Sequence, residues 1–192
     1  MCFSVVGSGW IASGRPRWTR KRYPECASDS HPRERVFRKG EKVRYNGADA
    51  LSSHAVLTRW LAEGRVVPFC PELAGGLGVP RPAAEIKGLN GEAVLDGHAR
   101  VSTQAGVDVT DSFLQGAYLA LATAQAHRVR VAVLKDGSPS CGSGSIYDGT
   151  FSGSRTTGHG VTTALFERNG IRVFSEQSFE EAAEYVSLLE QD

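Results

Sequence analysis

The stretch Val129-Arg-Val-Ala-Val-Leu134, followed by Lys-Asp-Gly-Ser-Pro-Ser-Cys141-Gly142, decides how the chain can fold. Its first six residues are mostly apolar and β-branched, which is typical of a strand that is buried on both faces of a sheet. The glycine, serine and proline residues that follow predict a loop at the carboxyl end of this strand. Ligands of α/β sheets bind beyond the carboxyl ends of the strands, so we expect Cys141 at a functional edge.

A second cysteine is predicted at the same edge. Arg65-Val-Val-Pro-Phe-Cys70 is a short β-rich run, and a loop rich in glycine and proline follows over residues 71–84. Glu72, two residues after the Cys70 thiol, is either a general base or a solvated loop carboxylate. Cys2 and Cys26 form no CxxC pair, and we expect them to be ordinary buried residues.

Helical and strand patterns alternate along the rest of the chain. Helices are expected over 55–63 after Ser52-Ser53, from Thr110 over about four turns, over 161–168, and after a capping box at Ser178. Strands are expected over 92–95, 99–103 and 171–174. Asp96-Gly97 is expected to join the first two of these strands as a hairpin. This order predicts an α/β fold with a mainly parallel sheet and helices on both faces, a Rossmann-like three-layer arrangement with a small β-hairpin insertion.

The composition excludes several classes of protein. With 192 residues, of which 41% are hydrophobic and 22% charged, the chain is neither disordered nor low in complexity. No apolar run is long enough to cross a bilayer and the first residues are a poor signal peptide, so we expect a cytoplasmic protein. Residues 1–40 carry a net charge of +6 and the remainder −5. Proline and acidic residues interrupt the basic ones, so we expect no nucleic-acid partner.

The loop after the central strand is unusually rich in glycine. Residues 136–160 contain seven of the 22 glycines. Such a loop lets backbone N–H groups approach an anion closely, although a mobile surface loop has the same composition. We expect Tyr147 and Phe151 to anchor it. Arg44, Tyr45, Arg81 and Lys135 are candidates for binding an anionic substrate, or are surface charges or members of ion pairs.

Several motifs follow one another in an order that resembles a known family. They are Val43-Arg-Tyr-Asn-Gly47, Cys70-Pro-Glu72 with Gly75-Gly76, Pro80-Arg-Pro82, Asp108-Val-Thr110, and Ser138-Pro-Ser-Cys141-Gly142 with Ile146-Tyr-Asp-Gly-Thr-Phe-Ser-Gly153. Together they resemble the bacterial family known as domain of unknown function 523, which includes the thiouracil desulfurases (desulfidases). The resemblance covers residues 40–192.

This resemblance implies an enzyme that hydrolyses a C–S bond. It implies a [4Fe–4S] cluster held by three cysteines, with one iron open to the sulfur of a thiolated pyrimidine base or nucleotide, and no net redox step. Cys70 and Cys141 carry over as cluster ligands, Glu72 as acid or base, and Ser138 and Ser140 as weaker catalytic candidates. Arg44, Tyr45 and Lys135 are the candidates for contacting the substrate. A non-catalytic protein that binds a small anion or a metal on the same fold is the alternative.

The chain departs from the family pattern before residue 40. By resemblance, a third cysteine belongs at the position of Phe37, after an apolar strand. With permitted codons, residues 29–38 read one base later give Ile-His-Ile-Leu-Val-Ser-Ala-Cys-Phe-Ala, an apolar run that ends in a cysteine. We therefore divide the chain into an irregular basic segment, 1–39, which we hypothesise to be out of frame, and one desulfidase-like α/β domain, 40–192. The first strand is then missing or corrupted.

Overall fold

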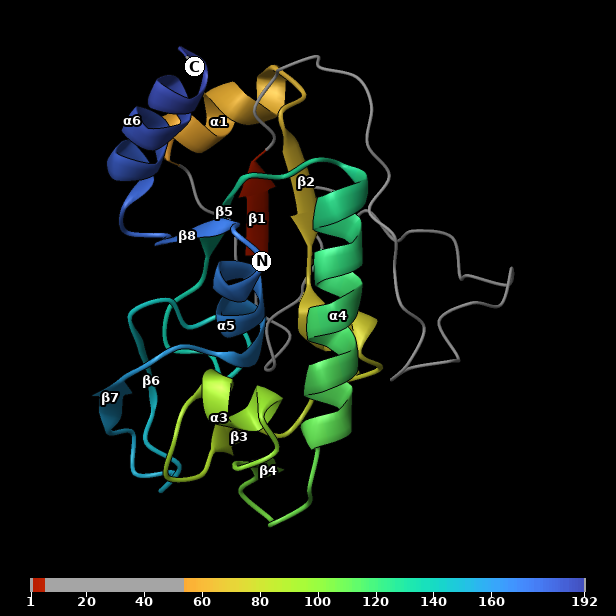
Figure 1. Cartoon of the computed structure of the whole chain (residues 1–192). Coiled ribbons are helices and arrows are strands. Elements are labelled where there is room, and N and C mark those ends of the chain that lie inside the picture. Colours follow the sequence, from red (N-terminus) through yellow and green to blue (C-terminus); the bar gives the residue numbers. More distant parts are fainter. Residues whose placement is uncertain (1, 6–53, 192) are drawn as a thin grey trace, which may run out of the picture.

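The computed structural model describes residues 2–5, as backbone, and residues 54–191, and it has a mixed α/β fold (Figure 1). A four-stranded sheet lies at its centre, in the order β2-β1-β5-β8. The strands are β1 (Cys2–Val5), β2 (Val66–Phe69), β5 (Val131–Leu134) and β8 (Arg172–Ser175). The last three come from runs that the sequence predicts as strands.

Strand β1 runs against both of its neighbours. It pairs antiparallel with β2 and with β5, whereas β5 and β8 are parallel. β2, β5 and β8 therefore point the same way, with one reversed strand among them (Figure 1). The sequence predicts a mainly parallel sheet, and the structure has a mixed one instead. The start of the chain fills the position between β2 and β5, where an antiparallel ladder pairs the backbone groups of both neighbours as fully as a parallel one.

Helices pack on both faces of strand β5. They are α1 (Ala55–Ala62) and α6 (Phe179–Leu189) on one face, and α4 (Thr110–Ala126) and α5 (Val161–Arg168) on the other. Val131 and Val133 belong to the apolar cluster of α1 and α6, whereas Ala132 and Leu134 belong to that of α4 and α5. Alternate residues of a strand point to opposite faces, so the burial of all four confirms the prediction from their sequence.

The segment before α4 folds differently from its prediction. Residues 92–95, expected as the first strand of a hairpin, lie in helix α3 (Gly91–Leu95). The partner of β4 (Val101–Thr103) is instead β3 (Ala84–Ile86), in an antiparallel pair. The helix forms because the side-chain oxygen of Asn90 accepts a hydrogen bond from the N–H of Ala93 at 3.1 Å, and Val94 is buried. Asp96 ends the helix rather than beginning a hairpin turn.

Two predicted helix caps also differ. Ser178 precedes α6, but its side chain makes no capping hydrogen bond, so the capping box does not form. Helix α1 begins after His54, whose Nδ1 accepts from the N–H of Val56 at 3.3 Å, and Ser52 and Ser53 lie outside the described residues. Both helices form where the apolar pattern predicts them, because burial of one face outweighs a single cap.

A short helix, α2 (Pro71–Ala74), interrupts the predicted loop 71–84 and rests on α4. Two glycines allow the contact. A Cβ atom on Gly75 would lie 2.0 Å from the carbonyl oxygen of Ser112, and one on Gly116 would lie 2.1 Å from that of Pro71. Since α2 follows Cys70 and carries Glu72, this close backbone contact fixes the position of both residues.

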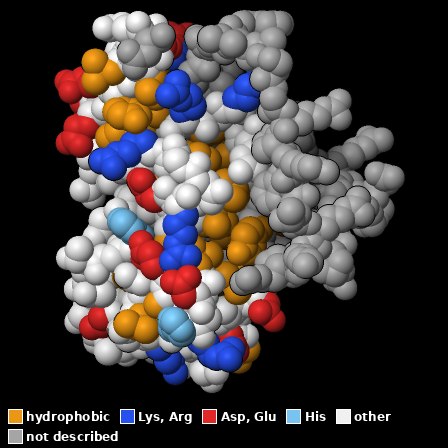
Figure 2. Space-filling view, in the orientation of Figure 1, with side chains coloured by type: hydrophobic (Ala, Val, Ile, Leu, Met, Phe, Trp, Pro, Cys, Tyr) orange, Lys and Arg blue, Asp and Glu red, His pale blue; other side chains and the backbone are white. Residues whose placement is uncertain are grey.

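Charged side chains of both signs are interspersed on the face seen in Figure 2, with apolar side chains between them. Among the described residues on this face, neither sign of charge forms an extended patch. Within residues 2–5 and 54–191, no helix has both the length and the apolar character needed to cross a membrane.

We expect the substitution Gly116→Ala to destabilise the protein. The new methyl group would meet the backbone carbonyl of Pro71, which cannot rotate away. Overpacking of this kind costs roughly 1–3 kcal/mol of the free energy of unfolding, which urea denaturation measures. Gly78→Ala is the control, because a Cβ atom there meets nothing within 4 Å. Equal unfolding midpoints for the two variants would contradict a tight contact between α2 and α4.

Candidate functional site

A cavity of about 460 Å³ lies beyond the carboxyl ends of β2 and β5. Its walls come from four parts of the chain, within the ranges 70–85, 103–113, 135–141 and 147–155. The predicted residues Cys70, Glu72, Lys135, Ser138 and Cys141 all line it. The two strand ends therefore bring five of the eight predicted site residues to one cavity of a size that holds a small ligand.

Cys70 is placed by β2 and α2. It follows the last residue of β2 and is the residue before Pro71, the first of α2, with 6% of its surface exposed. Burial raises the pKa of its thiol; the hydrogen bond from the Leu73 backbone opposes this shift, and the Glu72 carboxylate adds to it. The thiol is therefore neutral at pH 7, and it needs a bound cation beside it to act as a thiolate.

Cys141 is fixed through its backbone. Its N–H donates to Ser138 Oγ at 3.2 Å, and its carbonyl oxygen accepts from Thr163 Oγ1 at 3.0 Å. Its surface is 3% exposed. Its sulfur is part of a disulfide, so the bond has to be reduced before this residue can bind a metal.

Glu72 is held from two sides. Arg81 donates from Nε to Glu72 Oε2 at 2.8 Å, and its Nη2 lies 2.6 Å from the same oxygen. Ser138 Oγ donates to the other oxygen, Oε1, at 3.1 Å. The side chains of Arg81 and Glu72 are 8% and 17% exposed. The carboxylate is thus fixed at the cavity wall, where it can accept a proton from a water molecule that one of its remaining lone pairs orients.

Asp136 shapes the loop that carries Ser138 and Cys141. Its Oδ1 accepts from the N–H groups of Ser143, Gly144 and Ser145 at 2.9 to 3.0 Å, and its Oδ2 accepts from Ser145 Oγ at 2.7 Å. Burial alone would raise the pKa of this carboxyl, but the hydrogen bonds outweigh it and lower the pKa to about 2. Asp136 therefore stays ionised at physiological pH and closes the loop into a fixed turn.

The remaining predicted residues lie elsewhere or have other partners. The hydroxyl group of Ser140 is buried against Thr162 Oγ1 of α5 at 3.0 Å, and Ser140 is not among the residues that line the cavity. The structure thus places the Ser140 hydroxyl group in a hydrogen bond with α5, and its catalytic role stays a prediction. Lys135 lines the cavity and pairs with Glu176 at 3.1 Å. Arg44, Tyr45 and Phe37 lie outside the described residues.

Two acidic residues of the site are not predicted from the sequence, which also leaves the role of Arg81 open. The sequence around Asp136 offers a signal, since aspartate before glycine and serine residues often accepts hydrogen bonds from a turn. Nothing in the sequence indicates the role of Glu85, because its partner Phe151 lies 66 residues away. For Arg81 the structure shows the ion-pair alternative, with Glu72 as its partner.

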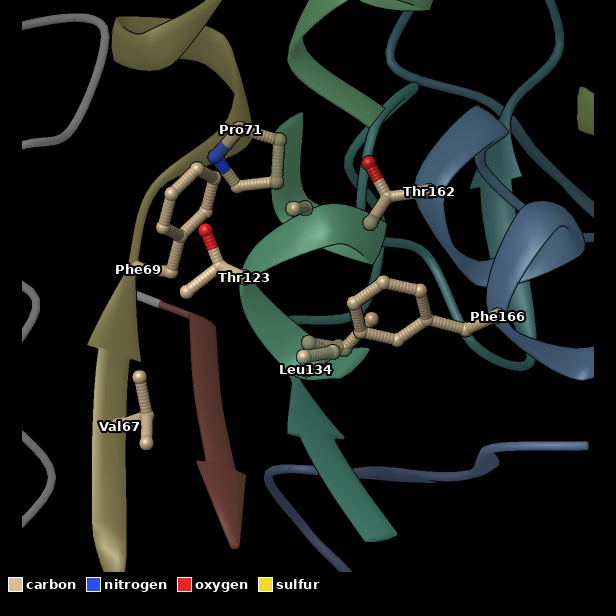
Figure 3. Close-up of a pocket in the computed structure, with 9 residues that line it drawn as sticks. Val67, Phe69, Pro71, Thr123, Leu134, Thr162 and Phe166 are labelled. Carbon is tan, nitrogen blue, oxygen red and sulfur yellow. The ribbon is translucent and has the colours of Figure 1, made fainter. Parts of the chain in front are cut away.

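A second, much smaller cavity lies behind Cys70, between β2, α4 and α5 (Figure 3). Phe69 and Pro71, the two neighbours of Cys70, line it together with Phe166. Its volume is about 10 Å³, which is at the lower limit for a single water molecule. It is a packing gap in the apolar core, so the larger cavity is the candidate site.

Two cysteines lie at the cavity, and the described residues hold no larger group of metal ligands. Among residues 54–191 there is no group of three histidine, cysteine, aspartate or glutamate side chains placed to hold one ion. Cys70 and Cys141 supply two sulfur atoms to the cavity wall. Strand β1 brings the backbone of Cys2 opposite Phe69, so a further cysteine begins at this same edge of the sheet.

The chain is similar to known proteins over most of its length. A family model described as 2-thiouracil desulfurase matches residues 39–178. The uncharacterised protein YbbK of Bacillus subtilis (strain 168) is 47% identical over 137 residues, which cover 71% of this chain and 89% of that protein. The solved structure of the [4Fe–4S]-dependent thiouracil desulfidase TudS has 48% identity and a TM-score of 0.70, and the match covers 78% of this chain and 92% of that one.

The carboxylate of Asp136 is expected to contribute to stability in a pH-dependent way. Its pKa is lower in the folded chain than the usual 3.8, so its contribution is present above about pH 3.8 and is lost as the pH falls towards 2. We expect Asp136→Asn to lower the free energy of unfolding at pH 7 by on the order of 1 kcal/mol, after allowance for solvent screening. Urea denaturation at pH 7 and pH 3 measures the difference. Asp111→Asn, on the exposed side of α4, is the control. A loss for Asp136→Asn that is equally large at both pH values would contradict this role.

Proposed function

Because the chain belongs to the 2-thiouracil desulfurase family, we propose that its larger cavity binds a thiolated pyrimidine base or nucleotide and removes the sulfur by hydrolysis. The observation that carries the proposal is the hydrogen bond between Ser138 and Glu72, since it joins an acid–base group to the loop of Cys141 inside the cavity that Cys70 also lines. Water supplies the new carbonyl oxygen and its two protons leave with sulfur as hydrogen sulfide. No electron is gained or lost, so no redox partner is needed.

Glu72 is the residue that we assign to proton transfer. Arg81 and Ser138 hold its two oxygens, so the carboxylate keeps one orientation. It would take a proton from the attacking water and return it to the departing sulfur. Ser138 acts as a positioning residue, because the same hydroxyl group that holds Glu72 also accepts from the N–H groups of Ser140 and Cys141. Lys135, at the cavity wall, remains our candidate for contacting the substrate together with Arg44 and Tyr45.

We propose that Cys70 and Cys141 are ligands of a [4Fe–4S] cluster, by similarity to the [4Fe–4S]-dependent desulfidase TudS. When bound, such a cluster supplies an iron that accepts sulfur as a Lewis acid. The high pKa of Cys70 is consistent with this role, because a buried thiol that is neutral alone becomes a thiolate when it binds metal. The described residues fit the cluster only in part, since they supply two of the three sulfur ligands that the resemblance implies.

We further propose that residues 1–39 are out of frame. The family model begins to match at residue 39, and strand β1 occupies the place between two strands of equal direction while running against both. An apolar strand read in the shifted frame would run parallel to β2 and β5, which would give the mainly parallel three-layer sheet. Its terminal Ser-Ala-Cys would then reach the edge where Cys70 and Cys141 lie.

The two-cysteine set also favours a second candidate function. A chain that keeps the cavity but lacks one cluster ligand could bind a small anion or a metal ion without turnover. The two candidates differ in iron content and in product, so one set of preparations separates them.

The first experiment compares the chain as written with a repaired chain in which residues 29–38 are replaced by Ile-His-Ile-Leu-Val-Ser-Ala-Cys-Phe-Ala. Both are reconstituted with iron and sulfide without air. We expect the chain as written to bind less than a full cluster and to release little or no sulfide from 2-thiouracil, and the repaired chain to gain both properties. The same repair with serine in place of its cysteine is the matched control, because it restores the strand without the thiol.

Full iron content and turnover in the chain as written would overturn the frame hypothesis. Loss of that iron on Cys2→Ser would then identify Cys2 as the third ligand. A repaired chain that binds metal or an anion but releases no sulfide would favour the non-catalytic candidate. The nucleotide sequence of codons 1–40 is an independent check, because codons that give no cysteine in either shifted frame exclude a frame error.

The second experiment tests the proton-transfer group. In the repaired chain, Glu72→Gln is expected to lower kcat by about 10²- to 10⁴-fold, the usual contribution of general acid–base catalysis, with iron content unchanged. Ser138→Ala is expected to lower kcat less, because it loosens Glu72 without removing it. Glu181→Gln, an exposed residue of α6, is the matched control. Unchanged kcat in Glu72→Gln would remove Glu72 from the mechanism.

A further inference from the structure

Glu85 is a buried acidic residue in the wall of the larger cavity, and neither acid–base chemistry nor metal binding has been assigned to it. It lies in β3 and is 6% exposed. Its Oε2 accepts a hydrogen bond from the backbone N–H of Phe151 at 3.0 Å. A carboxylate is rarely buried to this degree unless its oxygens have partners, so the position of Glu85 calls for a role.

The contact between Glu85 and Phe151 is rigid. Phe151 has a φ angle of 58°, a left-handed conformation that is costly for a phenylalanine, and the Glu85 carboxylate holds it there. Close by, Gly149 packs against β3 so tightly that a Cβ atom would lie 2.5 Å from the carbonyl oxygen of Ile86. The loop between β6 (Ser145–Tyr147) and β7 (Arg155–Thr157) is thus anchored to β3 at two points, and Glu85 cannot turn away from the cavity without releasing one of them.

The second oxygen of Glu85 is available to a ligand. Within residues 54–191, the hydrogen bond from Phe151 uses Oε2, and Oε1 has no hydrogen-bond partner. Glu85 lines the same cavity as Glu72, Cys70 and Cys141, together with the aromatic residues Tyr147 and Phe151. An ionised carboxylate oxygen only accepts hydrogen bonds, so its partner in the cavity has to be a donor.

We propose that Glu85 determines specificity by accepting a hydrogen bond from the ring N–H of the substrate. This inference rests on the proposed function. A thiolated pyrimidine carries N–H groups beside its thiocarbonyl carbon, and N3–H is the one present in both the free base and the nucleotide. Oε1 therefore selects the neutral thione that bears N3–H and discriminates against rings that are substituted or deprotonated at that nitrogen.

The test measures binding rather than turnover. Equilibrium dialysis of the anaerobically reconstituted full chain compares 2-thiouracil with its 1-methyl and 3-methyl derivatives. We expect the 3-methyl derivative to bind about 10- to 100-fold more weakly than 2-thiouracil, the usual range for loss of a hydrogen bond to a charged group, and the 1-methyl derivative to lose far less. In Glu85→Ala the preference for the ring with N3–H should disappear.

Glu85→Gln covers the case in which the alanine variant does not fold. Glutamine can still accept from Phe151 through its amide oxygen, but it then presents an N–H₂ group to the ring, so the preference should be lost in this variant too. Equal binding of all three compounds by the unaltered chain, no binding of any, or a preference that survives in Glu85→Gln would overturn the proposal. The proposed function itself is judged on the repaired chain: selective binding there without sulfide release would reject the proposed function and keep the role of Glu85, whereas turnover there without selectivity would do the reverse.

Discussion

The site depends on the hydroxyl group of Ser138. It donates to Glu72 Oε1 at 3.1 Å and accepts from the N–H groups of Ser140 and Cys141 at 3.0 and 3.2 Å. A serine hydroxyl has one donor and two acceptor positions, so these bonds use its full capacity. One atom thereby joins the segments that follow β2 and β5, although the residues lie 66 positions apart in the sequence. Each segment is also held by other contacts. Helix α2 is fixed by its close backbone contact with α4, and the loop after β5 is fixed by the hydrogen bonds of Asp136. Ser138 therefore connects two parts that are already rigid.

The sheet beneath the site accommodates one reversed strand among three strands of equal direction. Val131 and Val133 face α1 and α6, and Ala132 and Leu134 face α4 and α5, so β5 carries one apolar cluster on each of its faces. Pairing of β1 with β2 and β5 satisfies their backbone groups in the antiparallel sense. A reversed strand, however, brings its first residue, and not its last, to the edge where the cavity lies. The direction of this strand therefore decides which of its two end residues lies beside the cavity.

The sequence predicts the site better than it predicts the segments between the strands. The residues after β2 and β5 could be placed together, because the carboxyl ends of strands with the same direction share one edge. This rule brought Cys70, Glu72, Ser138 and Cys141 to one cavity. The rule could not show that Ser138 lines the cavity and Ser140 does not. The loop turns between these two residues, so that the Ser140 hydroxyl group contacts Thr162 of α5. The hairpin prediction over 92–103 failed at its first strand, because the Asn90 cap and the burial of Val94 favour a helix over 91–95. The hydrogen bond between Glu85 and Phe151 could not be predicted, because these residues are far apart in the sequence and meet only in the folded chain.

Most of the charge around the cavity is balanced within the chain. Glu72 is paired with Arg81, Lys135 with Glu176, and the carboxylate of Asp136 with the N–H groups of its turn. The cavity also has apolar and aromatic residues in its wall, and a small ligand in such a site is oriented by a few directed hydrogen bonds. In such surroundings the Oε1 atom of Glu85 would have a large effect, because a ring that offers no donor would leave this carboxylate oxygen without a hydrogen-bond partner among the described residues. The substrate preference of the site would then depend on Glu85, while the proposed chemistry would depend on Glu72, Cys70 and Cys141.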